Sequence, residues 1–576
     1  MHGFILSYSV HTPLPEFNYR WKKPFAFQTP LTLRSIRGKY LQLEQYTSEK
    51  FLAEKLWIDN EDYLMVTDGV ITNLSSLIKE YKTVDTTELI RQMRKASPTF
   101  FEHFHGSFVG LLFDKKSRQL MAFNNHTGTK KLFYYWGNDV LICSTDLYTL
   151  SQAMASLGIT RHWDEEASWL LLTSGFMHDD YTLLREVKQV TAGSYLQLNN
   201  ASVTINDYFN LKDITPIQDS KEEILKQLER LFDEALKEEY ELDRRYGLVG
   251  VSTLSGGLDS RMVALRSLEL GYDQQYWFNF SEPGYADEII ARDLAKAYKK
   301  ELRFIPLSAR GLMNIDQVVA VNDGLTLYSG AGHAFEALGQ LDMSRTGFVH
   351  TGMIGDAVMG SFLSGKEVGA AKISDGLYST SLLHRAQPVL EASTKKYRDG
   401  EMYKFYNRAF LGANNGFLYF ELAGACSSPF LYPPFLQYAQ SIPRQYLSGS
   451  RLYIEWIQRY HPRYADFIWE GMGGKPTNNN FLRQWYRWRK AIIKRLPVHS
   501  MWRKGMNPEQ EWYDKNPEVK ASLDTYFEEK IATFAGSSLM HDELSQLYTK
   551  GNITEKTQVL TLLAAWHLLM QDTRQE

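Results

Sequence analysis

The residues best suited to chemistry lie in one short segment, 255–260, which reads Ser-Gly-Gly-Leu-Asp-Ser. Its two glycines let the backbone approach an anion closely and adopt positive φ angles. Its serine hydroxyls can donate hydrogen bonds, and Asp259 is a hard oxygen ligand that suits a Mg²⁺ ion bridging phosphates. No Gly-Lys-Ser/Thr follows, so the segment is not the usual loop of GTPases and ATPases. The pattern predicts a site for phosphate and Mg²⁺; the alternative is a tight turn with incidental serines.

Such a site needs a strand before the loop and a helix after it. Residues 247–254 are apolar enough for a buried parallel strand, and residues 261–266 open a helix. Successive backbone N–H groups then point into the loop, and the helix dipole adds positive potential. We therefore expect an α/β fold around this segment.

The pattern of the chain changes near residue 209. Before it, short strands alternate with turns and with two helical stretches, near 86–95 and 164–173, which predicts a mixed α+β region. After a polar stretch, Ser220 and the acids behind it are typical of a helix start, and the rest of the chain is rich in helical patterns. The predicted units are residues 1–208, a linker 209–220 and residues 221–576.

Composition narrows the class of protein. The 576 residues suggest about two to four domains, and 44% hydrophobic with 23% charged residues is typical of soluble proteins. The net charge of −3 argues against a general nucleic-acid binder. Two cysteines, Cys143 and Cys426, exclude a disulfide framework and a cysteine zinc site. No signal peptide is evident, and the apolar run 559–570 is too short to span a bilayer, so a cytoplasmic location is expected.

Segment 255–260 matches the pyrophosphate loop of ATP pyrophosphatases, and the chain resembles the asparagine synthetase superfamily, which includes β-lactam synthetases and lasso-peptide cyclases. Residues 68–73, Asp-Gly-Val-Ile-Thr-Asn, resemble the family's Asp-Gly-Glu-Ile-Tyr-Asn turn, and residues 351–356, Thr-Gly-Met-Ile-Gly-Asp, resemble Ser-Gly-Glu-Gly-x-Asp. Further matching stretches, in the same order as in the family, are 105–114, 128–135, 192–196, 278–291, 429–431 and 441–443.

This resemblance covers nearly the whole chain and implies a fold and a chemistry. The fold is an Ntn-type αββα amidotransferase-like domain, then an α/β ATP-pyrophosphatase domain with a parallel sheet and a helix-rich C-terminal part. In the chemistry, a substrate carboxylate attacks the α-phosphate of ATP and releases pyrophosphate, and ammonia or an amine then displaces AMP to leave an amide.

The resemblance also assigns roles to individual residues. Ser255, Gly256, Gly257 and Ser260 would hold the pyrophosphate, Asp259 and Asp356 would hold Mg²⁺, and Leu254, Phe278 and Gly352 would lie near the nucleoside. Asp356 is alternatively a turn or cap aspartate. The cation nearest to the family's catalytic lysine is Arg451, so Asp259, Asp356 and Arg451 are the expected catalytic residues. Asp287 and Glu288 could belong to the site; alternatively, they are acids that simply favour the start of a helix.

The first half departs from the family at its nucleophile. Glutamine-hydrolysing members carry a cysteine after the initiator methionine, where this chain has His2. Asn124 and Asn125 stand at an arginine–aspartate position, and Asn73 is expected to be structural. We predict no glutaminase activity and a first domain retained as a scaffold.

The second half departs at the acceptor side. Met353 replaces a glutamate and cannot take a proton, and Tyr432 replaces the aspartate of Pro-Phe-Leu-Asp. Arg451 could stabilise charge but would donate a proton poorly. The family's residues are therefore present on the ATP side of the site, whereas those on the acceptor side are replaced.

Two further features suggest weaker hypotheses. Residues 483–504 contain eight Lys or Arg, three tryptophans and no acid. One interpretation is a dock for an acidic glycan or peptide; the other is a solvated amphipathic helix whose aromatics pack inward. His103 and His105 are two apart but lack a third metal ligand, and Cys426 is expected to be a packed, neutral thiol.

The leading hypothesis is an ATP- and Mg²⁺-dependent amide ligase that uses ammonia or an amine and no glutamine. Its carboxylate acceptor is left open among a small acid, a peptide and a sugar acid. The alternatives are a non-catalytic nucleotide-binding protein and a glutamine-hydrolysing asparagine synthetase. No nucleic-acid partner and no membrane span are expected, and a homodimer stays open.

Overall fold

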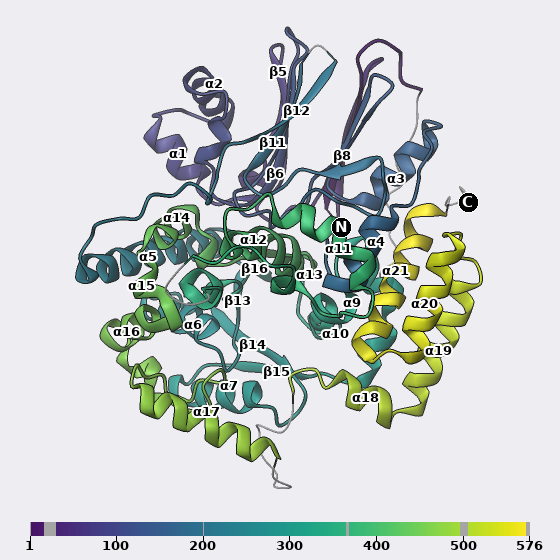
Figure 1. Cartoon of the computed structure of the whole chain (residues 1–576). Coiled ribbons are helices and arrows are strands. Elements are labelled where there is room, and N and C mark those ends of the chain that lie inside the picture. The colour runs from purple at the N-terminus through teal and green to yellow at the C-terminus, as the bar shows by residue number, and fades with distance from the viewer. Residues whose placement is uncertain (1, 16–29, 200, 364–367, 496–504, 572–576) are drawn as a thin grey trace.

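Two antiparallel sheets lie face to face in the first part of the chain (Figure 1). The computed structural model describes residues 2–15, 30–199, 201–363, 368–495 and 505–571. The first sheet has the strand order β10 (Val187–Gln189), β8 (Phe133–Gly137), β9 (Val140–Ser144), β1 (Gly3–Ser9), β3 (Leu41–Thr47) and β2 (Thr32–Arg37). The second has the order β12 (Ser202–Asp207), β11 (Ser194–Asn199), β7 (Leu120–Asn124), β6 (Gly106–Asp114), β5 (Tyr63–Ile71) and β4 (Trp57–Asp59).

Side chains alternate between the two faces of each sheet, because the period of a strand is two residues. In β1, Phe4 and Leu6 join the core between the sheets, whereas Ile5 joins the core on the outer face. In β5, Leu64 faces the other sheet and Met65 faces outward. Each outer face is covered by helices, so the region has four layers, helix–sheet–sheet–helix. These helices are α1 (Leu74–Glu80) and α2 (Thr86–Ala96) on one side, and α3 (Leu147–Ser156) and α4 (Glu165–Ser174) on the other.

The connection to the second part runs from the end of β12 at Asp207 to α5 (Lys221–Tyr246). Ser220 caps α5, because its hydroxyl accepts from the Glu223 N–H at 3.3 Å while the Glu223 carboxylate accepts from the Ser220 N–H at 2.8 Å. This reciprocal capping box fixes where the helix begins.

The second part is built on a five-stranded parallel sheet. Its strand order is β15 (Leu302–Pro306), β14 (Gln275–Ser281), β13 (Val249–Thr253), β16 (Thr346–His350) and β17 (Ala425–Ser427). After β13 the chain enters α6 (Leu258–Glu269), and after β14 it enters α7 (Ala286–Tyr298). The strand order changes direction between β13 and β16, and ligands bind parallel sheets at the carboxyl edge of such a point.

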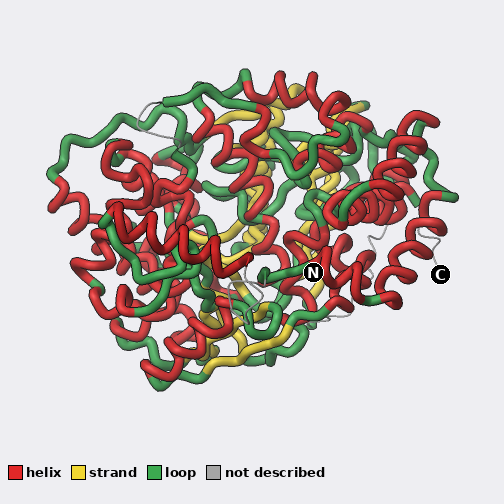
Figure 2. The backbone as a smooth tube through the Cα atoms, turned by 60° about the horizontal axis from the view of Figure 1, so that its bottom comes forward, coloured by secondary structure: helices red, strands yellow, loops and turns green. Residues whose placement is uncertain are grey.

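Most of the remaining chain is helical, and these helices lie around the strands (Figure 2). These helices are α8 (Ile315–Asn322), α9 (Tyr328–Ala331), α10 (Phe335–Leu338), α11 (Leu383–Thr394), α12 (Gly400–Tyr403), α13 (Asn415–Phe420), α14 (Pro433–Ser441), α15 (Arg444–Leu447), α16 (Arg451–Tyr460), α17 (Asn480–Arg495), α18 (Glu509–Lys515), α19 (Pro517–Ile531), α20 (Ser538–Lys550) and α21 (Ile553–Met570). Two further segments are π-helical, η5 (Ala357–Ser361) and η7 (Lys404–Ala413).

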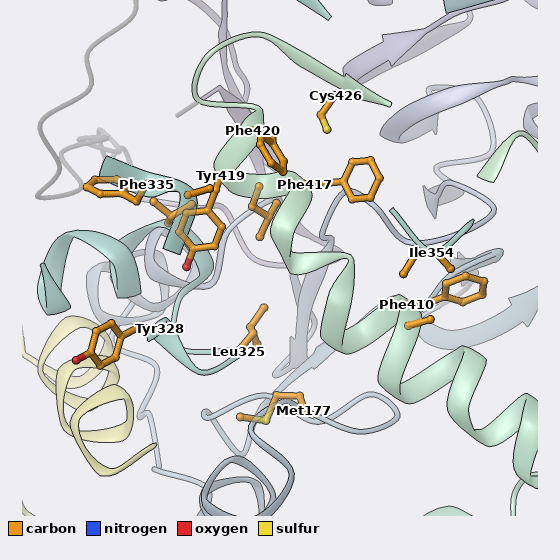
Figure 3. Packing of buried hydrophobic residues seen from close by; sticks show 14 of the residues in the cluster. Met177, Leu325, Tyr328, Phe335, Ile354, Phe410, Phe417, Tyr419, Phe420 and Cys426 are labelled. Atoms are coloured by element: carbon orange, nitrogen blue, oxygen red, sulfur yellow. The ribbon is translucent and has the colours of Figure 1, made fainter. Parts of the chain in front are cut away.

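One large apolar core joins the two parts of the chain. Helix α21 is buried almost all round and packs against α4 of the first part and α8 of the second. Figure 3 shows part of the same core around α13, whose Phe417 and Phe420 belong to one cluster with side chains from distant segments such as Met177 and Ile354. The apolar run 559–570 is therefore an interior helix, and among the described residues no helix is long and apolar enough to cross a membrane.

The described part of the basic, tryptophan-containing stretch lies in α17, and its two tryptophans do not pack inward as one interpretation expected. Trp485 is 42% exposed and Trp488 is 63% exposed. The opposite side of the helix, with Tyr486 and Ile493, makes the packing contacts. Trp502, Arg503 and Lys504 lie outside the described residues.

Candidate functional site

The loop between β13 and α6 lies at the carboxyl edge of the parallel sheet and is hydrogen-bonded to itself. The Ser255 N–H donates to Ser260 Oγ at 3.0 Å, and the Gly257 N–H donates to Ser255 Oγ at 3.1 Å. The Gly256 N–H donates to Asp287 Oδ1 at 2.9 Å. Asp287, on the first turn of α7, thus anchors the loop, and burial raises the pKa of its carboxyl to about 6.

Asp259, on the first turn of α6, is half-buried and has no cationic partner in the described part of the chain. Its Oδ2 accepts from the Asp356 N–H at 2.8 Å, whereas its Oδ1 has no hydrogen-bond partner in the described part of the chain. Burial, and after it the charge of Asp356, raises the pKa of the Asp259 carboxyl to about 8. A carboxylate in this position is stabilised by a cation, because an unpaired buried charge is costly.

The segment after β16 is pressed against the start of α6. A Cβ atom on Gly352 would lie 2.4 Å from the Ser260 nitrogen, and one on Gly355 would lie 2.7 Å from Asp259 Cγ. Between them, Ile354 has φ 68°, a left-handed conformation that is rare for a β-branched residue. Strain of this kind costs about 1–3 kcal/mol and clusters at functional sites. The close approach brings Asp356, which is exposed, next to Asp259.

The oxygen atoms of Asp259 and Asp356 decide whether this place suits a Mg²⁺ ion. Two carboxylates from adjacent strand ends, one with an orphaned oxygen, suit an ion that takes one or two carboxylates and fills its other positions with water and phosphate. No group of three or more His, Cys, Asp or Glu that could hold a metal occurs among the described residues. The donor set therefore fits a Mg²⁺ ion held jointly with phosphates and does not form a complete protein cage.

A cavity of about 480 Å³ opens beside the loop. Four of the residues expected near a nucleotide line it: Leu254, Ser255, Ser260 and Phe278. Its far wall is largely apolar and aromatic, with Phe176, Phe280, Met353, Tyr378 and Phe420. Asp287 and Arg408 are the charged side chains in the lining, apart from His333, whose pKa burial lowers.

The other expected site residues lie outside this lining. They lie at the junction of α6 and the segment after β16, where Asp356 is exposed; these residues are Gly256, Gly257, Gly352, Asp259 and Asp356. Arg451 is exposed at the first position of α16, and its carbonyl oxygen accepts from Asn478 at 3.0 Å. The side chain that α16 brings toward Asp259 is Tyr453, whose hydroxyl lowers the pKa of that carboxyl. Neither this hydroxyl nor Asp259 Oδ1 makes a hydrogen bond of normal geometry in the described part of the chain.

A second group of ionisable side chains lies where the two parts of the chain meet. The Lys130 ammonium contacts Asp68 Oδ2 and Glu421 Oε2, each at 2.9 Å, and all three side chains are at least nine-tenths buried. His2 Nδ1 lies 3.0 Å from Asp68 Oδ1. Burial by itself would raise the pKa of Asp68, but the charge of Lys130, and after it His2, keeps this pKa well below its usual range. This buried carboxylate is thus fully paired.

A cavity of about 480 Å³ adjoins this group. It is lined by His2, Lys50, Lys130 and Glu421, and by the thiol of Cys426. Burial raises the pKa of that thiol well above its ordinary value, so Cys426 is a neutral, packed thiol. Because thiolates are the nucleophilic form of cysteine, the lining of this cavity contains no activated thiol.

Three asparagines of the first part have structural partners. Asn73 donates to the His103 carbonyl at 2.8 Å and accepts from the His105 N–H at 2.9 Å. Asn124 donates to the Val190 carbonyl at 2.8 Å, and Asn125 donates to the Gly106 carbonyl at 3.1 Å. Their amides tie loops to strands.

His105 and Tyr432, which the sequence analysis also named, have partners within the protein as well. His105 Nδ1 lies 3.1 Å from Glu238 Oε2, and the Tyr432 ring lies 4.8 Å from the His105 ring, centre to centre. Tyr432 thus lies against the first part of the chain, outside the lining of the cavity beside the loop.

Comparison with known proteins bears on the first part of the chain. Residues 53–209 match the family model of the glutamine amidotransferase domain. This match begins after His2 and ends before α5. No curated protein matches the chain.

Solved structures offer remote similarity. Glutamine phosphoribosylpyrophosphate amidotransferase from B. subtilis, complexed with ADP and GMP, is 11% identical over 47% of this chain and 52% of its own, with a TM-score of 0.21. A structure of the allosteric regulatory enzyme of purine biosynthesis is 9% identical over 47% of this chain and 68% of its own, with a TM-score of 0.22. The chain thus spans about half the length of the first of these proteins. The family match identifies residues 53–209 as amidotransferase-like.

Proposed function

We propose that the protein is an ATP-dependent ligase that adenylates a carboxylate, releases pyrophosphate and transfers the acyl group to ammonia or an amine. The observation that carries this proposal is the Asp259–Asp356 pair at the start of the helix behind a serine–glycine loop: a half-buried carboxylate with one buried, unpartnered oxygen lies beside a second carboxylate. The resemblance of the loop to the ATP pyrophosphatases and the cavity beside it support the same assignment.

The roles of the residues follow from their positions. Asp259 and Asp356 would hold Mg²⁺, which when bound supplies positive charge to phosphate oxygens. Ser255 and Ser260 line the cavity and can turn their hydroxyls toward an anion. The Gly256 and Gly257 N–H groups, which are bonded within the loop, become donors to phosphate only after exchanging these partners. Catalysis would rest on positioning and electrostatic stabilisation.

In the proposed reaction, a carboxylate oxygen of the acceptor bonds to the α-phosphorus of ATP, and pyrophosphate leaves. The nitrogen of ammonia or an amine then bonds to the acyl carbon, loses a proton, and AMP leaves. Met353 lines the cavity where the family has a glutamate. Its thioether is not basic, and so Met353 cannot take that proton. The apolar far wall favours an acceptor with an apolar body, and Arg408 is the cationic side chain in the lining that suits its carboxylate.

We further propose that the chain does not hydrolyse glutamine. The cavity that adjoins His2 has a Lys130 ammonium paired with Asp68 and Glu421, and its thiol is the neutral Cys426. The amidotransferase-like region would then serve as a scaffold that packs against the second part. Release of glutamate from glutamine by the purified protein would contradict this part of the proposal.

One observation favours a second candidate, a non-catalytic nucleotide-binding protein. Lysine is absent from the described lining of the cavity beside the loop, and Arg451 is exposed on α16 outside it. A protein of this kind would bind Mg-ATP without turning it over.

The test is release of pyrophosphate from Mg-ATP, with ammonium present and with pools of small acids, peptides and sugar acids as acceptors. The variants are Asp259→Asn and, as a matched control, Asp293→Asn, whose side chain is exposed on α7. Release by the wild type and the control but not by Asp259→Asn is expected. Binding of Mg-ATP without release in any pool would favour the second candidate.

A further inference from the structure

Helix α17 presents an apolar stripe to solvent. Phe481, Trp485, Trp488 and Ile492 follow one another at positions i, i+4, i+7 and i+11, which places them on one face of a helix. Their exposed fractions are 75%, 42%, 63% and 36%, respectively. Together with Leu482, they make up five of the twelve large hydrophobic residues that are exposed in the described part of the chain. Such a concentration on one helix marks an interaction surface.

The same helix carries only positive charge. Its six basic residues are Arg483, Arg487, Arg489, Lys490, Lys494 and Arg495, and it has no acid. Arg487 is exposed, and the Arg489 guanidinium lies 5.0 Å from the centre of the Trp485 ring. The helix therefore combines aromatic rings with cations at its solvent side.

The packing of α17 does not use the stripe. On the opposite face the Tyr486 ring lies against Gly474, and Lys490 pairs with Glu470 at 2.7 Å. Arg483 donates to the Gly449 carbonyl at 2.7 Å. Because these contacts fix the helix, the stripe is available to a partner. In Figure 1, α17 runs along the outer edge of the second part, at the bottom of the view.

We propose that α17 binds the surface of an anionic lipid bilayer, lying parallel to it with the aromatic stripe in the headgroup region. Helices that lie in this interface have Trp, Phe or Leu on one face and Lys or Arg beside it, and tryptophan favours the boundary between headgroups and acyl chains. The helix is about 24 Å long, as 16 residues rise 1.5 Å each. Association in the plane of the membrane requires no spanning helix.

Charge and shape favour this occupant over two others. A second copy that paired α17 with α17 would bring two helices together that carry only positive charge. A nucleic acid would meet aromatic rings at the centre of the surface, with cations at its sides, and the net charge of the chain is −3. An anionic bilayer satisfies both the apolar stripe and the flanking cations.

The test is co-sedimentation of the full chain with vesicles of phosphatidylcholine alone and of equal parts phosphatidylcholine and phosphatidylglycerol. Trp488→Glu has a matched control in Leu539→Glu, since Leu539 is 44% exposed on α20. Arg487→Glu has a matched control in Lys226→Glu, which changes an exposed lysine of α5. Gel filtration and thermal unfolding of each variant check its size and fold.

The wild type is expected to sediment with the anionic vesicles and not with the neutral ones, and less so as salt rises. Trp488→Glu and Arg487→Glu should each weaken binding by about tenfold or more, while both controls bind as the wild type does. The proposal is overturned by absence of binding, by equal binding to neutral vesicles, or by equal losses in variants and controls. A Trp488→Glu variant that only turns a dimer into a monomer, or an RNA oligomer that binds more tightly than the vesicles, would also overturn it.

Discussion

Two aspartates of this molecule, the buried Asp68 and the half-buried Asp259, have opposite surroundings. Asp68, in the amidotransferase-like part, has a lysine and a histidine within 3.0 Å of its oxygens, and its pKa lies well below the usual range. Asp259, in the second part, has a backbone N–H and a neighbouring carboxylate, and its pKa is raised to about 8. The protein thus supplies the counter-ion of Asp68 itself, whereas the residues that the structure describes supply none to Asp259.

The difference separates a structural carboxylate from a candidate ligand site. Asp68 and Lys130 also engage Glu421 from the second part, so their charges help to hold the two parts together. Asp259 has no comparable partner among the described residues, and we propose that Mg²⁺ bound with phosphate takes this place. We expect the fully paired Asp68 site to keep its arrangement, whereas the Asp259 site is expected to change when its ligand binds.

The largest expected effect comes from removing the lysine of the paired site. Lys130→Met removes the ammonium that lies between the buried Asp68 and Glu421 carboxylates, and breaking a buried pair in this way costs about 3–5 kcal/mol. Urea unfolding of the variant should show this loss of stability. Lys116→Met, which removes an exposed pair with Asp62, is the control and should change stability little. Equal stability of both variants would show that Lys130 does not hold the two parts together.

A smaller effect is expected where the segment after β16 meets α6. In Gly352→Ala the new Cβ atom would lie 2.4 Å from the Ser260 nitrogen, so the segment must move away from α6. Overpacking of this kind destabilises by about 1–3 kcal/mol. Separation of Asp356 from Asp259 should also weaken Mg-ATP binding, as measured by calorimetry. Gly311→Ala is the control, because the nearest atom to its new Cβ is a side-chain oxygen at 3.5 Å. A Gly352→Ala variant that matches this control would contradict the close packing.

The smallest expected effect is on how the unfolding free energy depends on pH under acidic conditions. Because the pKa of Asp68 is lower in the folded protein than in the unfolded chain, its contribution to stability is complete above the unfolded value of about 4 and is lost as pH falls below it. In Lys130→Met the strongest cause of the lowered pKa is gone and only His2 remains, so the unfolding free energy should fall less steeply below about pH 4 than in the wild type. Urea unfolding along a pH series measures the two slopes. Parallel slopes would contradict the assignment of this shift to Lys130.

The sequence predicts the second of these sites better than the first. The strand, the loop 255–260 and the helix behind it are contiguous, so local pattern is sufficient to predict β13 and α6. Resemblance adds Asp356, which the structure brings to Asp259. The group of Lys130, Asp68 and Glu421 joins three distant segments, and nothing in the local pattern of any of them indicates a partner.

Side-chain direction is the other property that the sequence leaves open. The basic and aromatic composition of α17 is plain in the sequence, but either face of that helix could have been buried, and the structure turns the tryptophans outward. Likewise, the sequence gives Arg451 as the nearest cation to the site, whereas the structure brings Tyr453 of the same helix toward Asp259. Both cases depend on tertiary packing rather than on local pattern.

The most direct test of the account is calorimetric titration of the wild type and of Asp259→Asn with ATP, with and without Mg²⁺. We predict that the wild type binds ATP tightly only when Mg²⁺ is present, and that Asp259→Asn loses about a hundredfold in affinity while it unfolds at no lower temperature than the wild type. Equal Mg-ATP affinity in the two proteins, or wild-type binding that ignores Mg²⁺, would contradict the claim that the unpaired carboxylate of the second part is a ligand site.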